Sequence, residues 1–324
     1  MKVLIIGGAG MVGRKLAERL AKDGKLGSKA ISSLALYDVV PPQKPAGASF
    51  PVEISTGDLP TPGETDKLVA STPDVIFHLA AIVSGEAEQD FDKGYRINLQ
   101  GTMNLLDSVR RAGNKPRLVF TSSIAVFGAP FPEKIGDEFF QTPLTSYGTQ
   151  KAIGELLISD YTRKGILDGV SIRLPTICVR PGAPNKAASG FFSNIMREPL
   201  AGKEAVLPVS EDVRHWHASP RAATGFLIHA ATIDGEKLGA RRALSMPGLS
   251  VTVGEQIEAL RKVAGDKVVA RIKREPDAFI QGIVAGWPRN FDTRRALELG
   301  FKPDASFEEI IRIHIEDELG GKIA

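Results

Sequence analysis

The chain has 324 residues, enough for one large α/β unit and a smaller lobe, and its composition is ordinary for a globular protein. Its formal net charge of +3 comes from interspersed charges of both signs, which argues against nucleic acid as a partner. A single cysteine, Cys178, excludes an internal disulfide, no Cys/His cluster has metal-ligand spacing, and no apolar run reaches membrane-spanning length, so we expect a cytoplasmic protein without metal or membrane contact.

The N-terminal residues 2–13 combine a short apolar strand, a glycine-rich turn and the start of a helix. Glycine lacks a Cβ, so the turn can be tight and can bring amides close to a pyrophosphate, toward which the helix predicted over residues 11–22 directs its positive end. The candidate contacts are Gly7, Gly10, Met11, Val12 and Gly13. The spacing is G-x-x-G-x-x-G rather than the commoner G-x-G-x-x-G, so an ordinary strand-to-helix turn remains the alternative.

Residues 34–38 predict a second strand that ends in the carboxylate of Asp38. An acidic side chain at that position can accept both ribose hydroxyls of an adenosine and would repel a 2′-phosphate, so it favours NAD over NADP. A plain turn residue is the alternative for Asp38. A third strand at residues 52–54 precedes Asp58 and Leu59, where the carboxylate could reach an adenine amino group or cap a turn.

Two further strands and a helix follow. Residues 74–81 are almost continuously apolar, as expected for a strand covered on both faces, and His78 within them is interpreted as a core residue. Residues 91–112 have helical periodicity and contain Asn98. Residues 117–123 predict a strand that ends in hydroxyl side chains, at the edge where open α/β sheets place their chemistry.

A helix predicted from Ser146 to about Lys164 presents Tyr147 and Lys151 on one face, four residues apart. A tyrosine has an unperturbed pKa of about 10, but a nearby ammonium and an oxidised nicotinamide both favour its phenolate. The pair could therefore remove a hydroxyl proton near neutral pH. A surface pair without function is the alternative when the two residues are considered alone.

The glycine turn, the strand that ends at Ser123 and the Tyr/Lys helix occur in one order, and with them the chain resembles, over essentially its whole length, the extended branch of the short-chain dehydrogenase/reductase superfamily. The resemblance implies NAD bound by the turn, Asp38 and Asp58. It adds as cofactor contacts Leu59, Leu79, Ala80, Ala81, Asn98, Thr121, Tyr147, Lys151, Pro175, Thr176 and Ile177. It implies a catalytic set of Ser123, Tyr147, Lys151 and Asn98, in which Asn98 steadies the site and a proton-relay water.

The expected fold is α/β, a Rossmann-type doubly wound parallel sheet with a smaller C-terminal α/β substrate lobe. Residues 1–174, with returning segments at about 217–245, form the predicted NAD-binding domain, and residues 175–216 and about 246–324 mainly form the lobe. Members of the extended branch commonly dimerise through two helices, here roughly residues 91–112 and 147–164. The resemblance therefore also implies a homodimer.

A finer resemblance within the superfamily implies oxidation of a small sugar acid by NAD. Such a substrate needs a cation for its carboxylate and polar groups for its hydroxyls. The candidates are Arg180, Lys186 and Arg214 for the carboxylate, Ser84, Thr176 and Asn185 for hydroxyls, and Ser123 and Tyr147 for the reacting oxygen.

Two other functions stay open. A nucleotide-sugar epimerase or dehydratase would use the same Tyr/Lys chemistry, although Ala218-Ser219-Pro220 replaces the Val-x-Asp segment of many such enzymes. An NAD-sensing regulator without turnover would not need Tyr147 and Lys151, so the presence of this pair argues against it.

Overall fold

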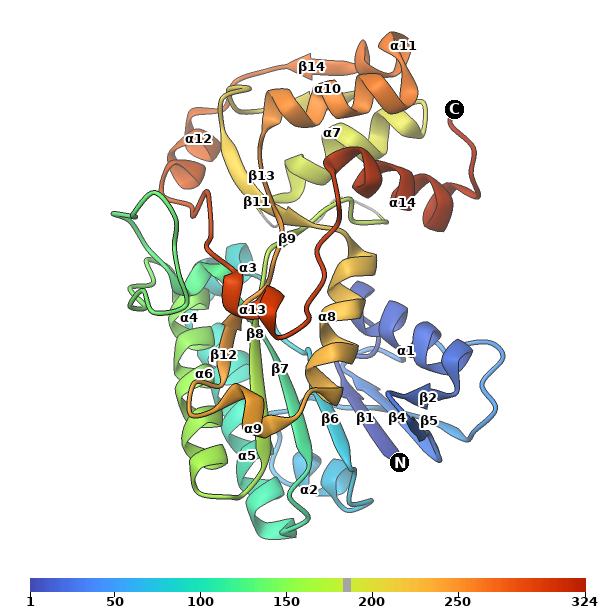
Figure 1. The fold of residues 1–324 in the computed structure, drawn as a ribbon, viewed down its shortest axis with the longest axis vertical. Helices are drawn as coiled ribbons and strands as arrows, with labels where there is room; N and C mark the ends of the chain where they lie inside the picture. The colour runs from blue at the N-terminus through green and yellow to red at the C-terminus, as the bar shows by residue number, and fades with distance from the viewer. Residues whose placement is uncertain (183–187) are drawn as a thin grey trace.

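The computed structural model describes residues 1–182 and 188–324, which form a parallel sheet with helices on both faces and a smaller lobe above it (Figure 1). The sheet has seven strands in the order β12-β8-β7-β6-β1-β4-β5, and every neighbouring pair is parallel. Their bounds are β1 Lys2–Ile6, β4 Ser33–Asp38, β5 Val52–Thr56, β6 Val75–His78, β7 Arg117–Ser123, β8 Asp168–Leu174 and β12 Ala243–Ser245. The predicted fold class is confirmed.

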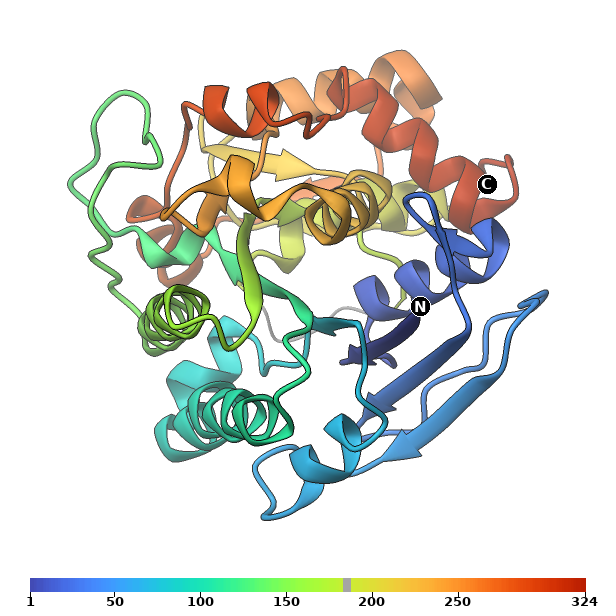
Figure 2. The same cartoon turned by 60° about the horizontal axis from the view of Figure 1, so that its bottom comes forward.

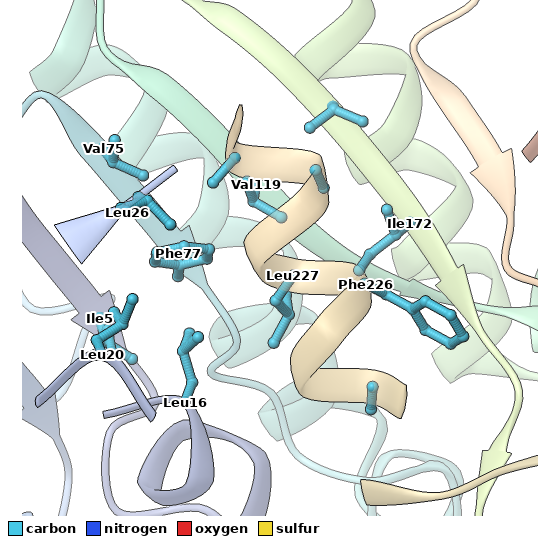
Figure 3. Close-up of a cluster of buried hydrophobic side chains, with 14 of the residues drawn as sticks. Ile5, Leu16, Leu20, Leu26, Val75, Phe77, Val119, Ile172, Phe226 and Leu227 are labelled. Atoms are coloured by element: carbon cyan, nitrogen blue, oxygen red, sulfur yellow. The ribbon is translucent and has the colours of Figure 1, made fainter. Parts of the chain in front are cut away.

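Helices cover the sheet on both sides (Figure 2). One face packs against α1 (Met11–Asp23) and α8 (Pro220–Thr232), and the other against α2 (Glu64–Val69), α5 (Gly101–Ala112) and α6 (Ser146–Arg163). Successive strand residues point to opposite faces. Figure 3 shows Ile5 and Phe77 on the side of α1 and α8, whereas Leu4 and Ile76 belong to the core on the side of α5 and α6.

The smaller lobe has its own sheets and core. A three-stranded sheet contains β9 (Thr176–Ile177), β11 (Arg214–Ala218) and β13 (Leu249–Thr252), and a pair contains β10 (Ala205–Leu207) and β14 (Ile272–Arg274). The helices of the lobe are α7 Gly190–Leu200, α10 Val253–Ala264, α11 Asp266–Val269, α12 Ala278–Ala285 and α14 Phe307–Leu319. The remaining short elements are β2 Lys25–Leu26, β3 Lys29–Ala30, α3 Ser84–Gln89, α4 Phe91–Gly94, α9 Gly235–Leu238, α13 Arg294–Glu298 and a 3₁₀ turn at Ile124–Val126.

One predicted helix is interrupted. The pattern over residues 91–112 predicts a single α-helix, but a π-helical turn at Tyr95–Gln100 separates α4 from α5. A π turn is characteristic of a site where a side chain must be directed to a particular place, and this one carries the buried Asn98. The domain boundaries stay a prediction. Among the described helices, none is both long and apolar enough to cross a membrane.

Candidate active site

The glycine turn follows β1 and contacts the segment after β6, the strand that pairs with β1. Helix α1, which follows β1, and helix α5, which follows β6, cover opposite faces of the sheet. Gly7 has a φ of +97°, and a Cβ on it would lie 2.6 Å from the amide nitrogen of Ala80. A Cβ on Gly13 would lie 2.1 Å from the carbonyl oxygen of Gly7. Both glycines are therefore needed for the close approach of backbone to backbone.

Gly10 has a different environment. It is the N-cap of α1, and a Cβ on it would meet only the Gly7 carbonyl oxygen, at 3.4 Å. No described side chain caps the first turn of α1, and this turn contains no acidic residue. The first-turn amides and the positive helix end are thus available to a diphosphate, which fits the pyrophosphate of NAD.

Asp38 ends β4 beside this turn. One of its carboxylate oxygens accepts the amide of Ala9 at 2.9 Å and the other accepts the amide of Val39 at 2.7 Å. Each carboxylate oxygen keeps a free lone pair, so Asp38 can still accept ribose hydroxyls. The predicted adenine contact, Asp58, forms an exposed ion pair with Arg96 at 2.5 Å, and its role stays a prediction.

Three of the four predicted catalytic residues come from two adjacent elements, β7 and α6. Ser123 ends β7, and its Oγ accepts the amide of Ala125 at 3.1 Å, which leaves the hydroxyl hydrogen free to be donated. Tyr147 and Lys151 lie in the first turns of α6, whose N-terminus is capped by Thr145. Lys151 is only 3% exposed, and its Nζ donates to the carbonyl oxygen of Thr121 at 2.8 Å and lies 5.6 Å from the centre of the Tyr147 ring.

The ionisation of this cluster is strongly perturbed. Burial raises the pKa of Tyr147 to about 12, while a hydrogen bond with Ser123 and the positive charge of Arg180 act in the opposite direction. Burial lowers the pKa of Lys151 to about 7, against the opposing effect of Glu155. Among the described residues, the cation that favours the phenolate of Tyr147 is therefore Arg180, which was predicted only as a possible substrate contact, and not Lys151.

Asn98 connects two parts of the site. Its Oδ1 accepts the amide of Ile82 at 2.9 Å, and its Nδ2 donates to the Ile82 carbonyl at 3.2 Å and to Gln150 Oε1 at 2.7 Å. The side chain therefore ties the segment after β6 to α6, next to Lys151. A relay water on Asn98 stays a prediction. His78 is buried, its Nε2 hydrogen-bonds to Thr102, and burial lowers its pKa to about 3, as expected for a neutral core histidine.

Arg180 follows β9 and is half-buried close to Tyr147. Its Nε donates to the carbonyl of Ile177 at 3.0 Å, and its Nη2 donates to Ser189 at 2.6 Å. Burial lowers its pKa, and no described carboxylate pairs with it. Residues 169–197 contain no Asp or Glu at all. A half-buried cation that pairs with no described carboxylate is an evident place for an anionic ligand.

Other predicted substrate residues lie in different settings. Arg214 begins β11, where it donates to the Ser250 carbonyl at 2.7 Å and pairs with Glu255 at 3.3 Å, and its side chain is 38% exposed. Ser84 begins α3 and is partly buried. Asn185 and Lys186 lie outside the described residues.

Sequence reasoning gave no role to His215. It lies on β11 beside β9, fully buried, with its ring stacked at 5.2 Å on Phe192 and hydrogen-bonded to Thr176 at 2.7 Å. In the run Arg214-His215-Trp216-His217, a tryptophan lies between the two histidines. Two histidines alternating with a tryptophan in a strand could have indicated that both imidazoles point into the same interior.

Comparisons with known proteins agree with this geometry. A family model described as "NAD dependent epimerase/dehydratase family" matches residues 3–236. A D-erythronate dehydrogenase from Cupriavidus necator is 49% identical over 321 residues, 98% of each chain, and one from Haemophilus influenzae is 46% identical over 319 residues, 98% of this chain and 100% of its own length.

A solved structure described as the nucleoside-diphosphate-sugar epimerase from Agrobacterium tumefaciens is 67% identical, with a TM-score of 0.98, and the match covers 100% of this chain and 96% of that one. An L-threonine dehydrogenase from Clostridium difficile has a TM-score of 0.85 at 24% identity, covering 100% and 99% of the two chains, and this likeness shows the fold alone.

Proposed function

The chain belongs to the NAD dependent epimerase/dehydratase family, whose cofactor is NAD, and on that premise we propose that it oxidises D-erythronate to the corresponding 2-oxo acid. Two full-length relatives with that activity in their names support the choice of substrate. The observation that carries the proposal is the grouping of Tyr147, a candidate base, with the Ser123 hydroxyl and the guanidinium of Arg180. A base beside a half-buried cation that pairs with no described carboxylate suits an alcohol that also carries a carboxylate.

In the proposed reaction, the hydroxyl on C2 of D-erythronate donates its proton to the phenolate of Tyr147 while the C2 hydride leaves. Ser123 donates its hydroxyl hydrogen to the same oxygen, while the Ala125 amide donates to its Oγ. Bound NAD supplies the hydride acceptor and, in its oxidised form, a positive charge that favours the phenolate. Lys151, held on the Thr121 carbonyl, positions its remaining N–H groups for the nicotinamide ribose.

Arg180 is the proposed partner of the substrate carboxylate. Arg214 is the weaker candidate, because its guanidinium already has a carbonyl and a carboxylate as partners and is partly in solvent. The carboxylate of D-erythronate is bonded to the reacting carbon, so its partner must lie close to the base. The effect of Arg180 on the pKa of Tyr147 supports that proximity.

A nucleotide-sugar epimerase remains the second candidate, because the 67% identical solved structure carries that description. Such an enzyme would use the same tyrosine on a much larger substrate. A regulator that only senses NAD is the third, and it requires no base. Release of NADH with D-erythronate supports our proposal, binding of a UDP-sugar without that signal favours the epimerase, and NAD binding without turnover on any alcohol favours the sensor.

The decisive variant is Tyr147→Phe, which removes only the phenolic oxygen. Loss of general base catalysis lowers kcat by roughly 10²–10⁴-fold, measured as the rate of NADH formation from D-erythronate. Tyr161→Phe, the same change on the same helix, is the control and keeps the rate. Full turnover of the Tyr147 variant, with NAD binding unchanged, would refute the mechanism.

A homodimer and a cytoplasmic location complete the proposal. Exposed apolar side chains on α4, α5 and α6, namely Phe91, Met103 and Leu156, support pairing of these helices with those of a second copy. Leu156→Glu would then convert the dimer to a monomer in a measurement of mass in solution. A monomeric wild type at assay concentrations would refute the dimer.

A further inference from the structure

The imidazole of His215 is held by hydrogen bonds at both nitrogens. Its Nδ1 lies 2.9 Å from the carbonyl oxygen of Pro288, and its Nε2 lies 2.7 Å from Oγ1 of Thr176. The ring is 3% exposed and is stacked almost parallel to Phe192, with the centres 5.2 Å apart and the planes 4° apart. Neither the ring position nor its two partners can change without breaking a buried contact.

These partners determine which atoms carry hydrogen. A carbonyl oxygen can only accept, so Nδ1 of His215 must be the N–H that donates to Pro288. Burial lowers the pKa of His215 to about 4, so above that pH the ring is neutral and its Nε2 has no hydrogen. Nε2 is then an acceptor, and the Thr176 hydroxyl must donate to it. The only hydrogen of that hydroxyl is used, and Oγ1 can act toward a ligand solely as an acceptor.

Thr176 follows directly after the strand end that lies beside Ser123. Leu174, the last residue of β8, is paired with Ser123 at the end of β7, and Thr176 follows only two residues later. Ile177, the next residue, accepts the hydrogen bond from Arg180. Thr176 is partly exposed, whereas His215 behind it is not. Thr176 therefore belongs to the short segment that joins the strand end beside Ser123 to Arg180, the cation proposed for the carboxylate.

We propose that His215 is a positioning residue that fixes Thr176 as an obligatory acceptor for the substrate hydroxyl on C3, the carbon next to the reacting one. The inference rests on the proposed function, since it concerns the same substrate at the same site. A polar acceptor that cannot become a donor selects for a ligand with an O–H at that place. A ligand lacking this hydroxyl leaves Oγ1 without its partner, which is the basis of strong discrimination in hydrogen-bonding sites.

The test compares two substrates on each enzyme preparation, D-erythronate and its 3-deoxy analogue, which lacks only the C3 hydroxyl. Thr176→Val is expected to lower kcat/KM for D-erythronate by roughly 10–100-fold, as expected when one hydrogen bond is lost, and to leave that for the analogue within about threefold. His215→Phe is expected to lower the ratio of kcat/KM for D-erythronate to kcat/KM for the analogue several-fold, because the Thr176 hydroxyl becomes free to rotate. The double variant should match Thr176→Val alone.

The ratio of the two kcat/KM values does not depend on how much of a preparation is folded, so damage to the buried aromatic cluster cannot imitate the effect. Controls are Thr149→Val, a helix threonine whose hydroxyl bonds a backbone carbonyl, and His229→Phe, which loses a comparable histidine-to-carbonyl bond away from the site. Both keep the wild-type ratio.

Equal losses on the two substrates, or a raised KM for NAD with an unchanged ratio, would overturn the inference and assign Thr176 to the cofactor or to packing. The proposed function survives those outcomes. Absence of NADH formation from D-erythronate by the wild-type enzyme would overturn both.

Discussion

The cofactor side and the substrate side of the site meet at one edge of the sheet but are made in different ways. On the cofactor side, the turn from Gly7 to Gly13 presents backbone amides, and its shape depends on the absence of side chains. On the proposed substrate side, Arg180, Thr176 and His215 are charged or polar side chains carried by the smaller lobe and held by partly buried hydrogen bonds.

This difference determines which kind of substitution should damage each side of the site. A backbone site is damaged by added volume, which is measured as lost stability or weaker NAD binding. A site made of buried polar side chains is damaged by leaving a partner unpaired, which is measured as lost specificity or a changed pH profile. Variants on the two sides should therefore be separable by which measurement changes.

The largest effect is expected on the substrate side. Removing one partner of a buried, hydrogen-bonded charge pair costs about 2–5 kcal/mol, so Arg180→Met should lower kcat/KM for D-erythronate by roughly 10²–10³-fold. Arg214→Met is the matched control, and because surface pairs contribute about 0–1 kcal/mol, it should lower kcat/KM by less than about fivefold.

Steady-state kinetics at fixed saturating NAD would measure both variants. A larger loss in the Arg214 variant would exchange the two assignments. Equal and small losses in the two variants would mean that neither arginine binds the substrate carboxylate. Lys186 would then be the remaining predicted candidate.

A smaller effect with a defined sign is expected at Ser123, where the two sides meet. The Ser123 hydrogen bond lowers the pKa of Tyr147, which burial raises to about 12. In Ser123→Ala this influence is lost, so the pKa of the base rises and the limb of kcat/KM that increases with pH moves to higher pH. We also expect at least about a tenfold lower rate at neutral pH, because a donor to the reacting oxygen is lost.

Ser122→Ala is the control for this shift. Ser122 is the preceding residue of β7, but its hydroxyl donates to Glu155 at 2.5 Å rather than to Tyr147. Its loss removes one hydrogen bond to the Glu155 carboxylate, which Arg173 still pairs with, so stability should fall by about 1.5–3 kcal/mol while the pH limb stays in place. A limb that moves equally in both variants, or to lower pH in the Ser123 variant, would contradict the assigned interaction.

The cofactor side could be predicted from the sequence because its signals are local. The strand, glycine turn and helix are consecutive, and the helix predicted over residues 11–22 is found at Met11–Asp23. The carboxyl ends of parallel strands lie at the same edge of the sheet, so residues that follow successive strands come together there.

The substrate side could not be predicted to the same extent. His215 is 39 residues from Thr176 and 73 residues from Pro288, and its role depends on the pairing of β9 with β11. The sequence alone does not distinguish Arg180 from Arg214 as the partner of the substrate carboxylate. They differ only in burial and partners, which the packing of the lobe decides.

The smallest change, one methyl group, separates two roles within the glycine turn itself. In Gly13→Ala the new Cβ would meet the Gly7 carbonyl oxygen at 2.1 Å, and backbone must move, which we expect to cost at least about 1–3 kcal/mol in the free energy of unfolding. In Gly10→Ala the nearest atom is 3.4 Å away, so the stability should stay within about 0.5 kcal/mol of wild type.

Gly10 nevertheless lies where the uncapped first turn of α1 would receive the diphosphate, so its methyl group should raise the KM for NAD while the KM for D-erythronate is unchanged. Chemical denaturation and NAD titration of both variants measure the two effects. Two outcomes would contradict this expectation: Gly10→Ala destabilises the protein as much as Gly13→Ala does, or it binds NAD as wild type does. Either outcome would mean that Gly10, like Gly13, is needed for packing and not for diphosphate binding.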